Sequence, residues 1–401
     1  MKKANKIRIF RVAAVMFALL LAYCLATFSN MPEVSERDVV TMMGIDYVDG
    51  KIRVTAHILV PVSNEENKFN QDTAEAEGKD IFSALDKFSI AQGRKVEFSK
   101  CGVVVFGKAL AERGLLNEVK GLLSANIVSP GIVMLVSNTP TAKEFLSAAD
   151  DLGEETSEHI GRFINRFENT LSMPMLVVLT FLDGELGESH ASFIPCIELE
   201  YKHTENDAPE ESSGKEEEKN SKTDIASVNS TAVFKEGKSV GQLTADETKG
   251  LIFTLPESRR GSYYIDGFSF NGQEFGSVYA DVTRKSVKAK TSFENGKPKI
   301  RYDISMNIVV DTKQEFLYLF DEGIAGKTEF YAAVAEAFKE KVSSQIEAAI
   351  TVSRKLDVDY MNLKYRFYRM NNRAIKAYEK NPDNDFLRDL QTEVKVNIKI
   401  K

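Results

Sequence analysis

The residues best suited to chemistry lie in a Gly-Lys-Thr triplet at positions 326–328. The triplet follows an apolar run and opens a helical pattern, which imitates a phosphate-binding loop. Such a loop needs a glycine five residues before the Gly-Lys pair. That position holds Asp321 beside Glu322, and two carboxylates repel phosphate. We therefore expect Gly323 and Gly326 to shape a loop, with Thr328 capping the helix and no bound nucleotide.

Histidine, cysteine and serine patterns add no further site. No metal-ligand spacing such as HExxH occurs among the four histidines, His57, His159, His190 and His203. No disulfide or zinc spacing occurs among the three cysteines, Cys24, Cys101 and Cys196. Cys101 lies in an apolar run and is expected to be a small buried hydrophobe. No GxSxG serine motif is present. We predict no catalytic residue, no cofactor and no metal, and a protein that is not an enzyme.

Composition limits the classes of protein to consider. The chain has 401 residues, 43% of them apolar and 28% charged. That size and composition fit a soluble globular body of two or three domains. The formal net charge of −7 gives no support for nucleic-acid binding.

The N-terminus has the pattern of a membrane anchor or a signal segment. Five basic residues precede an uncharged run of 17 residues, Val12 to Phe28. This order predicts a cytoplasmic N-terminus, with everything after Asn30 outside the cytoplasm. Cys24, in this run, is either a lipid-attachment site or a residue of an uncleaved spanning helix. The large Tyr23 before it and the apolar residues after it favour the helix.

Strand and helix patterns alternate up to residue 200. Asp49-Gly50 predicts a hairpin between strands at Val39–Tyr47 and Ile52–Val60. The polar stretch Ser63–Gly78 is expected to be a loop. Further elements are a helix with apolar residues Ile81, Phe82, Leu85 and Phe88, strands near 100–107 and 131–137, a helix over Lys108–Ser124, and a helix capped by Thr139.

An acidic stretch near residue 210 is the expected domain boundary. Residues 198–224 contain ten acidic residues and four lysines, a net of −6. Such a composition cannot bury enough apolar surface to fold. We predict a solvated linker over residues 201–228.

The second half begins with turn and cap signals. Hairpin turns are predicted at Glu236-Gly237 and Asn295-Gly296, and Thr244 with Glu247 matches a capping box. Strands are expected between Ser262 and Val310.

A long helix and a strand complete this half. The helix is predicted over Lys327–Lys355, and its apolar residues recur every four positions. Because four residues exceed one helical turn, this stripe winds and its ends must face different surfaces. The alternation of Val394, Val396, Ile398 and Ile400 predicts a half-buried antiparallel strand.

Aromatic and basic residues interleave over 359–380, with Lys364, Arg366, Arg369 and Arg373. We expect an amphipathic helix packed on its own domain with its basic residues outward. Contact with anionic lipid headgroups or with a partner protein is the alternative.

Together these patterns predict a multi-domain α+β or mixed α/β fold with mixed and antiparallel sheets and packed helices. The expected divisions are an anchor or signal segment over 1–30, a mixed α/β domain over 31–200 with room for two subdomains, the linker over 201–228, and an α+β domain over 229–401.

Several of these segments together resemble the C subunit of spore nutrient-germinant receptors, the Ger(x)C family. The hairpin segment ERDVVTMMGIDYVDGKIRVTAHILVP, the following KDIFSALDKFS and KVEFSKCGVVVFGKALAERGL, and GIVMLVSNTPTAKEFL resemble its N-terminal part. STAVFKEGKSVGQLTADETKGLIF, the long helix and the alternating strand are similar to its C-terminal domain.

The resemblance implies a non-enzymatic membrane protein that acts beside two integral-membrane receptor subunits in the inner spore membrane. It leaves the nutrient ligand open. The family places its lipidated cysteine near Phe28 or Ser29, so Cys24 lies a few residues early, and both interpretations of Cys24 remain. The family also carries tryptophan near Leu356–Tyr378, where this chain has none.

The residues leave two other functions open. One is a membrane-tethered, extracytoplasmic module that binds a small molecule, which would need a deep, mostly apolar cleft. The other is an envelope hydrolase, which would need His57, His159 or His190 gathered with a carboxylate and a nucleophile.

Overall fold

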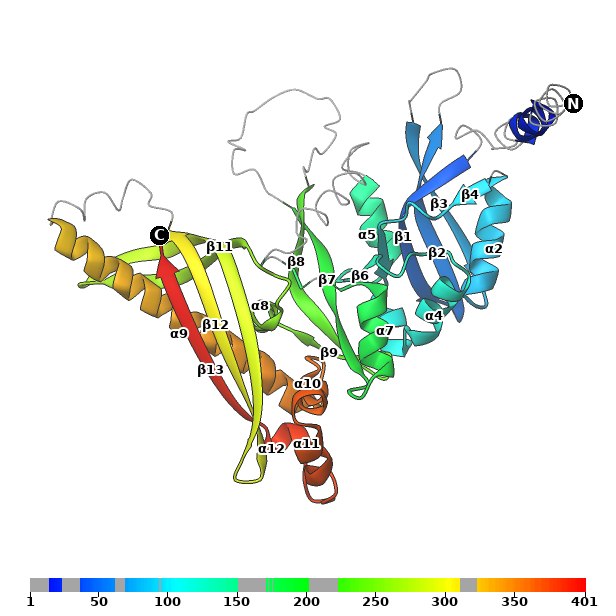
Figure 1. Cartoon of the computed structure of the whole chain (residues 1–401). Coiled ribbons are helices and arrows are strands. Elements are labelled where there is room, and N and C mark those ends of the chain that lie inside the picture. Colours follow the sequence, from blue (N-terminus) through cyan, green and yellow to red (C-terminus); the bar gives the residue numbers. More distant parts are fainter. Residues whose placement is uncertain are drawn as a thin grey trace, which may run out of the picture.

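The computed structural model contains two β-sheets that stand side by side (Figure 1). One sheet has nine strands and the other has four. The structure describes residues 14–23, 37–61, 69–93, 95–150, 171, 173–174, 176–201, 223–310 and 323–401.

The nine-stranded sheet is mixed. Its centre is four parallel neighbours, and antiparallel strands extend it on both sides in the order β3-β2-β1-β5-β6-β7-β8-β9, with β4 beside β1. The strands are β1 (Arg37–Val48), β2 (Lys51–Pro61), β3 (Phe69–Gly78), β4 (Lys95–Glu97), β5 (Val103–Phe106), β6 (Val133–Ser137), β7 (Ala191–Tyr201), β8 (Thr223–Lys235) and β9 (Lys238–Leu243). This architecture confirms the predicted fold class.

Two-residue turns form the hairpins that the sequence predicts. Asp49 and Gly50 have φ angles of 50° and 80°, and Glu236 and Gly237 have 52° and 78°. Positive φ at both central residues is what a type I′ hairpin turn needs. The loop prediction was wrong for residues 69–78, which form β3 and pair with β2 along its length. Pairing at a sheet edge here overrides the low strand propensity of an Ala- and Glu-rich segment.

Helices cover both faces of the nine-stranded sheet. On one face lie α2 (Ile81–Gln92), α3 (Lys108–Arg113), α4 (Leu116–Ser124) and α7 (Val178–Leu186). On the other face lies α5 (Ala142–Asp150), whose Phe145 and Leu146 join a second core cluster with Met42. The sheet is therefore buried on both sides.

Three local predictions in these helices were wrong. The helix expected over Lys108–Ser124 is two helices, because Gly114 adopts a φ of 132°, which no helix allows. The cap of α5 is Thr141 and not Thr139, since the Thr141 hydroxyl accepts from the backbone N–H of Glu144 at 3.1 Å. Phe82 lies 51% exposed, off the buried face of α2.

The acidic stretch does not separate the two sheets. β8 begins at Thr223, inside the predicted linker, and β8 and β9 extend the sheet that the preceding residues begin. One continuous cluster of buried apolar side chains then runs on through α8 (Ala245–Thr254) into the second sheet. The division predicted at residues 201–228 thus falls within a single sheet.

The four-stranded sheet has the order β10-β11-β12-β13. β10 (Gly261–Phe270), β11 (Gln273–Glu294) and β12 (Lys297–Val310) form an antiparallel meander. Its predicted turn at Asn295-Gly296 is confirmed. β13 (Gln391–Ile400) runs parallel to β12, so its predicted antiparallel direction was wrong. The intervening helices return the chain to the start of β12 and not to its end.

The long helix α9 (Gly323–Leu356) covers the inner face of this sheet (Figure 1). Its winding stripe is confirmed as buried from Phe330 to Ile350. At one end, the Phe330 ring meets rings of β10 and β11, including Phe268 at 5.8 Å. Further along, α8 crosses so closely that a Cβ on Gly250 would lie 1.9 Å from the Gln345 carbonyl oxygen. The two ends of the stripe face different elements, as predicted.

Short helices close the chain. The capping box of α8 is confirmed, since Thr244 and Glu247 exchange side-chain and backbone hydrogen bonds. The single helix expected over the basic segment is two, α10 (Leu363–Met370) and α11 (Asn372–Tyr378), and α12 (Phe386–Asp389) follows. Phe367 of α10 packs edge-on against Phe293 of β11 at 5.6 Å. These helices therefore close the end of the sheet where β11 turns into β12.

Candidate functional site

The predicted anchor lies only partly within the described residues. Residues 14–23 form an exposed helix, whereas Cys24 lies outside the described part of the chain. Within the described part, no helix combines the length and the apolar character needed to cross a membrane.

The Gly-Lys-Thr triplet lies inside α9, which begins at Gly323. The predicted loop with Thr328 as its cap was therefore wrong. The triplet also lacks the geometry of a phosphate-binding loop, because its backbone is helical and does not curve around a ligand.

The two described histidines, His57 and His190, each have a ring nitrogen near a backbone carbonyl oxygen. His57 is buried on β2, with its Nε2 3.2 Å from the Leu146 carbonyl oxygen. The Nδ1 of His190 lies 3.2 Å from the Glu185 carbonyl oxygen. His159 and His203 fall outside the described residues. Over the part of the chain that the structure describes, no three His, Cys, Asp or Glu side chains gather as metal ligands.

The two described cysteines are buried thiols. Burial raises the pKa of Cys101 to about 12 and that of Cys196 to about 11. Both therefore stay protonated near neutral pH, and a protonated buried thiol is a poor nucleophile. Cys101 is the buried residue that its apolar surroundings predict.

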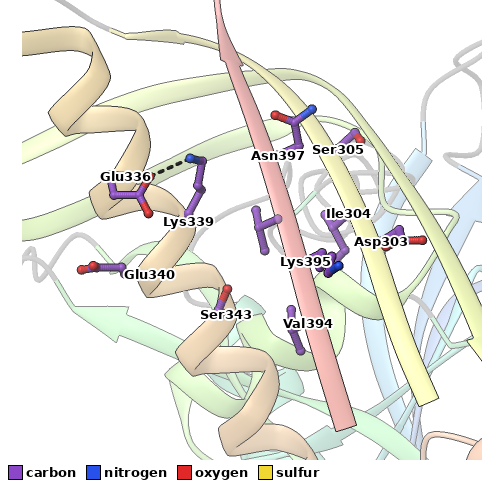
Figure 2. Close-up of a pocket in the computed structure, with 11 residues that line it drawn as sticks. Asp303, Ile304, Ser305, Glu336, Lys339, Glu340, Ser343, Val394, Lys395 and Asn397 are labelled. Carbon is purple, nitrogen blue, oxygen red and sulfur yellow. Dashed lines mark hydrogen bonds and ion pairs between the residues drawn. The ribbon is translucent and has the colours of Figure 1, made fainter. Parts of the chain in front are cut away.

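A groove of about 630 Å³ lies between α9 and the edge of the four-stranded sheet (Figure 2). Its α9 wall carries Glu336, Lys339, Glu340 and Ser343. The opposite wall is formed by β12 and β13, with Val394 and Val396 toward the helix side. The groove thus has a polar wall, an apolar strip and a strand edge along one side.

Most charges around this groove already have partners. Glu336 pairs with Lys339 at 2.6 Å. On the outer face of the sheet, hydrogen bonds from Lys290 and then Arg301 lower the pKa of Asp303. Asp303 therefore remains ionised at neutral pH and places a fixed negative charge beside the groove.

The strand beside the groove has a free backbone edge. β13 pairs only with β12 among the described strands, and the register runs from Gln391 to Ile400 without a shift. The N–H of Lys401 donates to the Ile308 carbonyl. Because strand N–H and C=O groups alternate between the two sides, Val394, Val396 and Ile398 direct theirs away from β12.

A second groove of about 620 Å³ lies on the other side of α9, against β10. Here the strand edge is irregular. The register of β10 shifts between Ile265 and Phe268, and Gly267 between them has a φ of 67°. A bulge of this kind bends an edge and hinders further pairing.

A polar crevice of about 360 Å³ opens where the parallel strands β5 and β6 end. It is lined by Lys108 and Glu112 of α3, and by Asn138 and Gln242. The Gln242 amide donates to the Asn138 carbonyl oxygen at 3.0 Å. The Asn138 amide in turn donates to Glu198 at 3.1 Å. These amides hold β6, β7 and β9 together.

Two buried carboxyl groups hold turns and loops of the molecule in place. Glu185 of α7 accepts from the Gly237 N–H at 2.6 Å, and burial raises its pKa to about 7. Asp359 accepts from the Ser189 hydroxyl at 3.0 Å and from two backbone N–H groups at the start of α10. Burial raises the pKa of Asp359 to about 6. The Glu185 bond fixes the β8–β9 turn to α7, and the Asp359 bonds fix the α7–β7 loop to the start of α10.

The basic segment lies on the surface of α10 and α11. Arg369 and Arg373 are exposed, as expected, whereas Lys364 pairs with Glu379 at 2.7 Å. Arg366 is partly buried. This segment therefore packs on its own domain, with only part of its charge outward.

Family models match almost the whole body of the chain. The model for the spore germination protein N-terminal domain matches residues 30–199. The model described as spore germination B3/GerAC-like, C-terminal, matches residues 229–401. The chain belongs to the GerAC-like family of spore germination proteins.

A solved structure has the same overall fold. The crystal structure of the GerBC protein aligns with a TM-score of 0.51 at 15% sequence identity, covering 89% of this chain and 96% of that one. A search of curated proteins found no match. The resemblance to the germinant-receptor C subunit family is confirmed.

The sequence patterns of this GerAC-like chain do not predict the free edge of β13 or the groove beside it. The alternation in residues 391–400 predicts a half-buried strand. It does not show that β13 is an edge or that α9 leaves a groove beside it. That arrangement depends on pairing across about ninety residues, for which one sequence carries no local signal.

Proposed function

We propose that this chain is a non-enzymatic, membrane-anchored subunit of a nutrient germinant receptor. It faces outside the cytoplasm, in the inner spore membrane, and acts by assembly with two integral-membrane subunits. The observation that carries the proposal is the match of both spore germination domains over residues 30–199 and 229–401. The basic and then apolar N-terminus supports the membrane anchor.

The geometry favours assembly over the two alternatives. A small-molecule module needs an enclosed, mostly apolar pocket. The three hollows described above are surface grooves, and polar or charged residues make up at least half of the lining of each. A hydrolase needs a nucleophile beside a base, and His57 and His190 instead lie against backbone carbonyl groups.

Gene deletion tests the function. Spores lacking this protein should form normally and should lose germination with at least one nutrient, and a plasmid copy should restore it. A strain that lacks all paralogues as well and still responds to every nutrient would contradict the proposal.

The anchor has its own test at Cys24. Metabolic labelling with a fatty-acid analogue should mark the wild-type chain and not Cys24→Ala if the cysteine carries lipid. An unlabelled wild-type chain that stays in the membrane fraction would assign residues 12–28 to an uncleaved helix.

A further inference from the structure

The two edges of the four-stranded sheet differ in their capacity to accept another strand. The pairing of β10 with β11 is interrupted by a bulge at Gly267, which bends the edge. β13 offers ten residues in unbroken register, with neither proline nor glycine within Gln391–Ile400. Open backbone groups on such an edge are a template for a strand from another chain.

The groove along β13 has the place and the size for that strand. A new strand lies about 4.8 Å from its neighbour, which is where the groove of about 630 Å³ runs between β13 and α9 (Figure 2). Every second side chain of the added strand would point toward α9 and cover the half-buried Val394 and Val396. The others would lie on the outer face of the sheet.

The charges on the outer face of β13 determine which charge on an added strand is favourable. Lys395, Asn397 and Lys399 are exposed there, beside Asp303, Ser305 and Asn307 of β12 in the same register. Lys395 pairs with Glu393 at 3.3 Å, whereas Lys399 forms no ion pair with any described residue. Acidic side chains opposite these lysines would form favourable cross-strand pairs.

We propose that β13 pairs edge to edge with an extended segment of a partner subunit. This segment carries acidic residues on one face, opposite Lys395 and Lys399, and small apolar residues on the other, over Val394 and Val396. The inference rests on the proposed function, because it takes the partner from the receptor complex. A second copy of the chain is a poorer occupant, since this face of β13 carries two lysines, Lys395 and Lys399, against the single acid Glu393, so that two β13 strands would gather net positive charge.

The edge can be blocked without disturbing β12. Val396 directs its N–H away from β12, so Val396→Pro removes one free donor and keeps the existing ladder, as edge prolines do. Lys399→Glu reverses the charge that an acidic strand would meet. Lys288→Glu is the matched control, because Lys288 is an exposed lysine on the outer face of the same sheet but on β11.

The experiment uses the tagged full-length chain, extracted in mild detergent from the cells that make it together with the membrane subunits that co-purify. Val396→Pro should reduce the co-purified subunits at least tenfold. Lys399→Glu should reduce them about two- to fivefold, as expected for one cross-strand charge pair, and Lys288→Glu should leave them unchanged. Thermal unfolding of each variant shows whether it is folded.

Hydrogen exchange of the wild-type complex tests the proposal without a substitution, so that misfolding of a variant cannot affect the result. The amides of Val394, Val396 and Ile398 should exchange more slowly in the complex than in the isolated chain. A complex that forms while these amides keep their exchange rates would overturn the edge proposal and leave the receptor function intact. If the wild-type chain retains no membrane subunit, the proposed function fails, and this inference with it.

Discussion

The two sheets of this protein bury their faces differently. The nine-stranded sheet has an apolar core on each side, one with α2, α3, α4 and α7 and the other with α5. The four-stranded sheet has α9 on one side, and its other side carries ion pairs such as Lys290 with Asp303 at 2.9 Å. The first sheet is an interior layer, while the second leaves its outer face exposed and the β13 edge without a further described strand.

Each half also buries an ionisable side chain that holds a chain end or a turn. In the first, the Glu185 carboxyl accepts one N–H at the β8–β9 turn. In the second, the Lys285 amine on β11 donates to the carbonyl oxygens of Ile252, Phe253 and Leu255 at 2.7 to 3.1 Å. Burial lowers the pKa of Lys285 to about 7, and its protonated form suits the C-terminus of α8, where the helix dipole is negative. Each buried group thus fixes a chain end or turn to its sheet.

Truncation of core side chains should have the largest effect on the free energy of unfolding. It also tests whether the two sheets bury their faces as described. Phe145→Ala on the α5 side and Phe338→Ala under α9 should each lower the free energy of unfolding by about 3 to 5 kcal/mol. Ser286→Ala, on the outer face of the four-stranded sheet, should change it by less than about 0.5 kcal/mol. Urea unfolding measures all three. A cost for Ser286→Ala equal to that for Phe338→Ala would mean that this outer face is also buried.

Removal of the buried Lys285 amine should have the next largest effect on stability. Lys285→Met keeps an unbranched side chain that is one atom shorter, and it leaves carbonyl groups at the end of α8 without their donor. We expect a loss of about 2 to 4 kcal/mol in urea unfolding. Lys288→Met, an exposed lysine on the same strand, is the control and should be near neutral. Equal stability of the two variants would show that Lys285 does not hold α8.

Glu185→Gln tests the buried carboxyl through pH. Burial raises the pKa of Glu185 from 4.5 to about 7, so between these values the folded state holds a proton that the unfolded state has released. The stability contribution of this group is therefore complete below pH 4.5 and declines as the pH rises through 7. The variant, which cannot ionise, should gain stability relative to wild type from pH 5 to pH 8. A difference between the two proteins that does not vary with pH would contradict the assignment.

The smallest effect is expected on the outer face. Lys290→Ala removes an exposed partner of Asp303, and such pairs add little in water. The urea midpoint should stay within experimental error of wild type, in low salt and in 0.5 M NaCl alike (about 0.5 M is enough to screen surface charges). A clear loss confined to low salt would show that the charges of this face act as a network.

Local signals predicted a large part of the fold. The turns at Asp49-Gly50, Glu236-Gly237 and Asn295-Gly296 and the capping box at Thr244 depend on neighbouring residues, and all form as expected. The stripe of α9 was also predictable, because helical geometry fixes how a four-residue repeat winds.

The wrong predictions concern segments whose structure depends on pairing with strands far away in the sequence. Residues 69–78 have a loop-like composition, yet β2 recruits them as an edge strand. The direction of β13 depends on how residues 311–390 return the chain to β12, which alternation alone does not encode. The candidate edge site was missed for the same reason, since it exists only after the parallel pair has formed.

The parallel pairing of β12 with β13 also bears on how the chain reaches its native state. Lys299 aligns with Gln391, 92 positions later, so this contact closes one of the longest loops in the second half. Loops of that length close slowly and lower the folding rate. Until β13 arrives, β12 itself is an open edge with Ile300, Ile304 and Ile308 on one face, a template for aggregation. Maturation of this half should therefore be slow, and the unpaired β12 edge is where aggregation would begin.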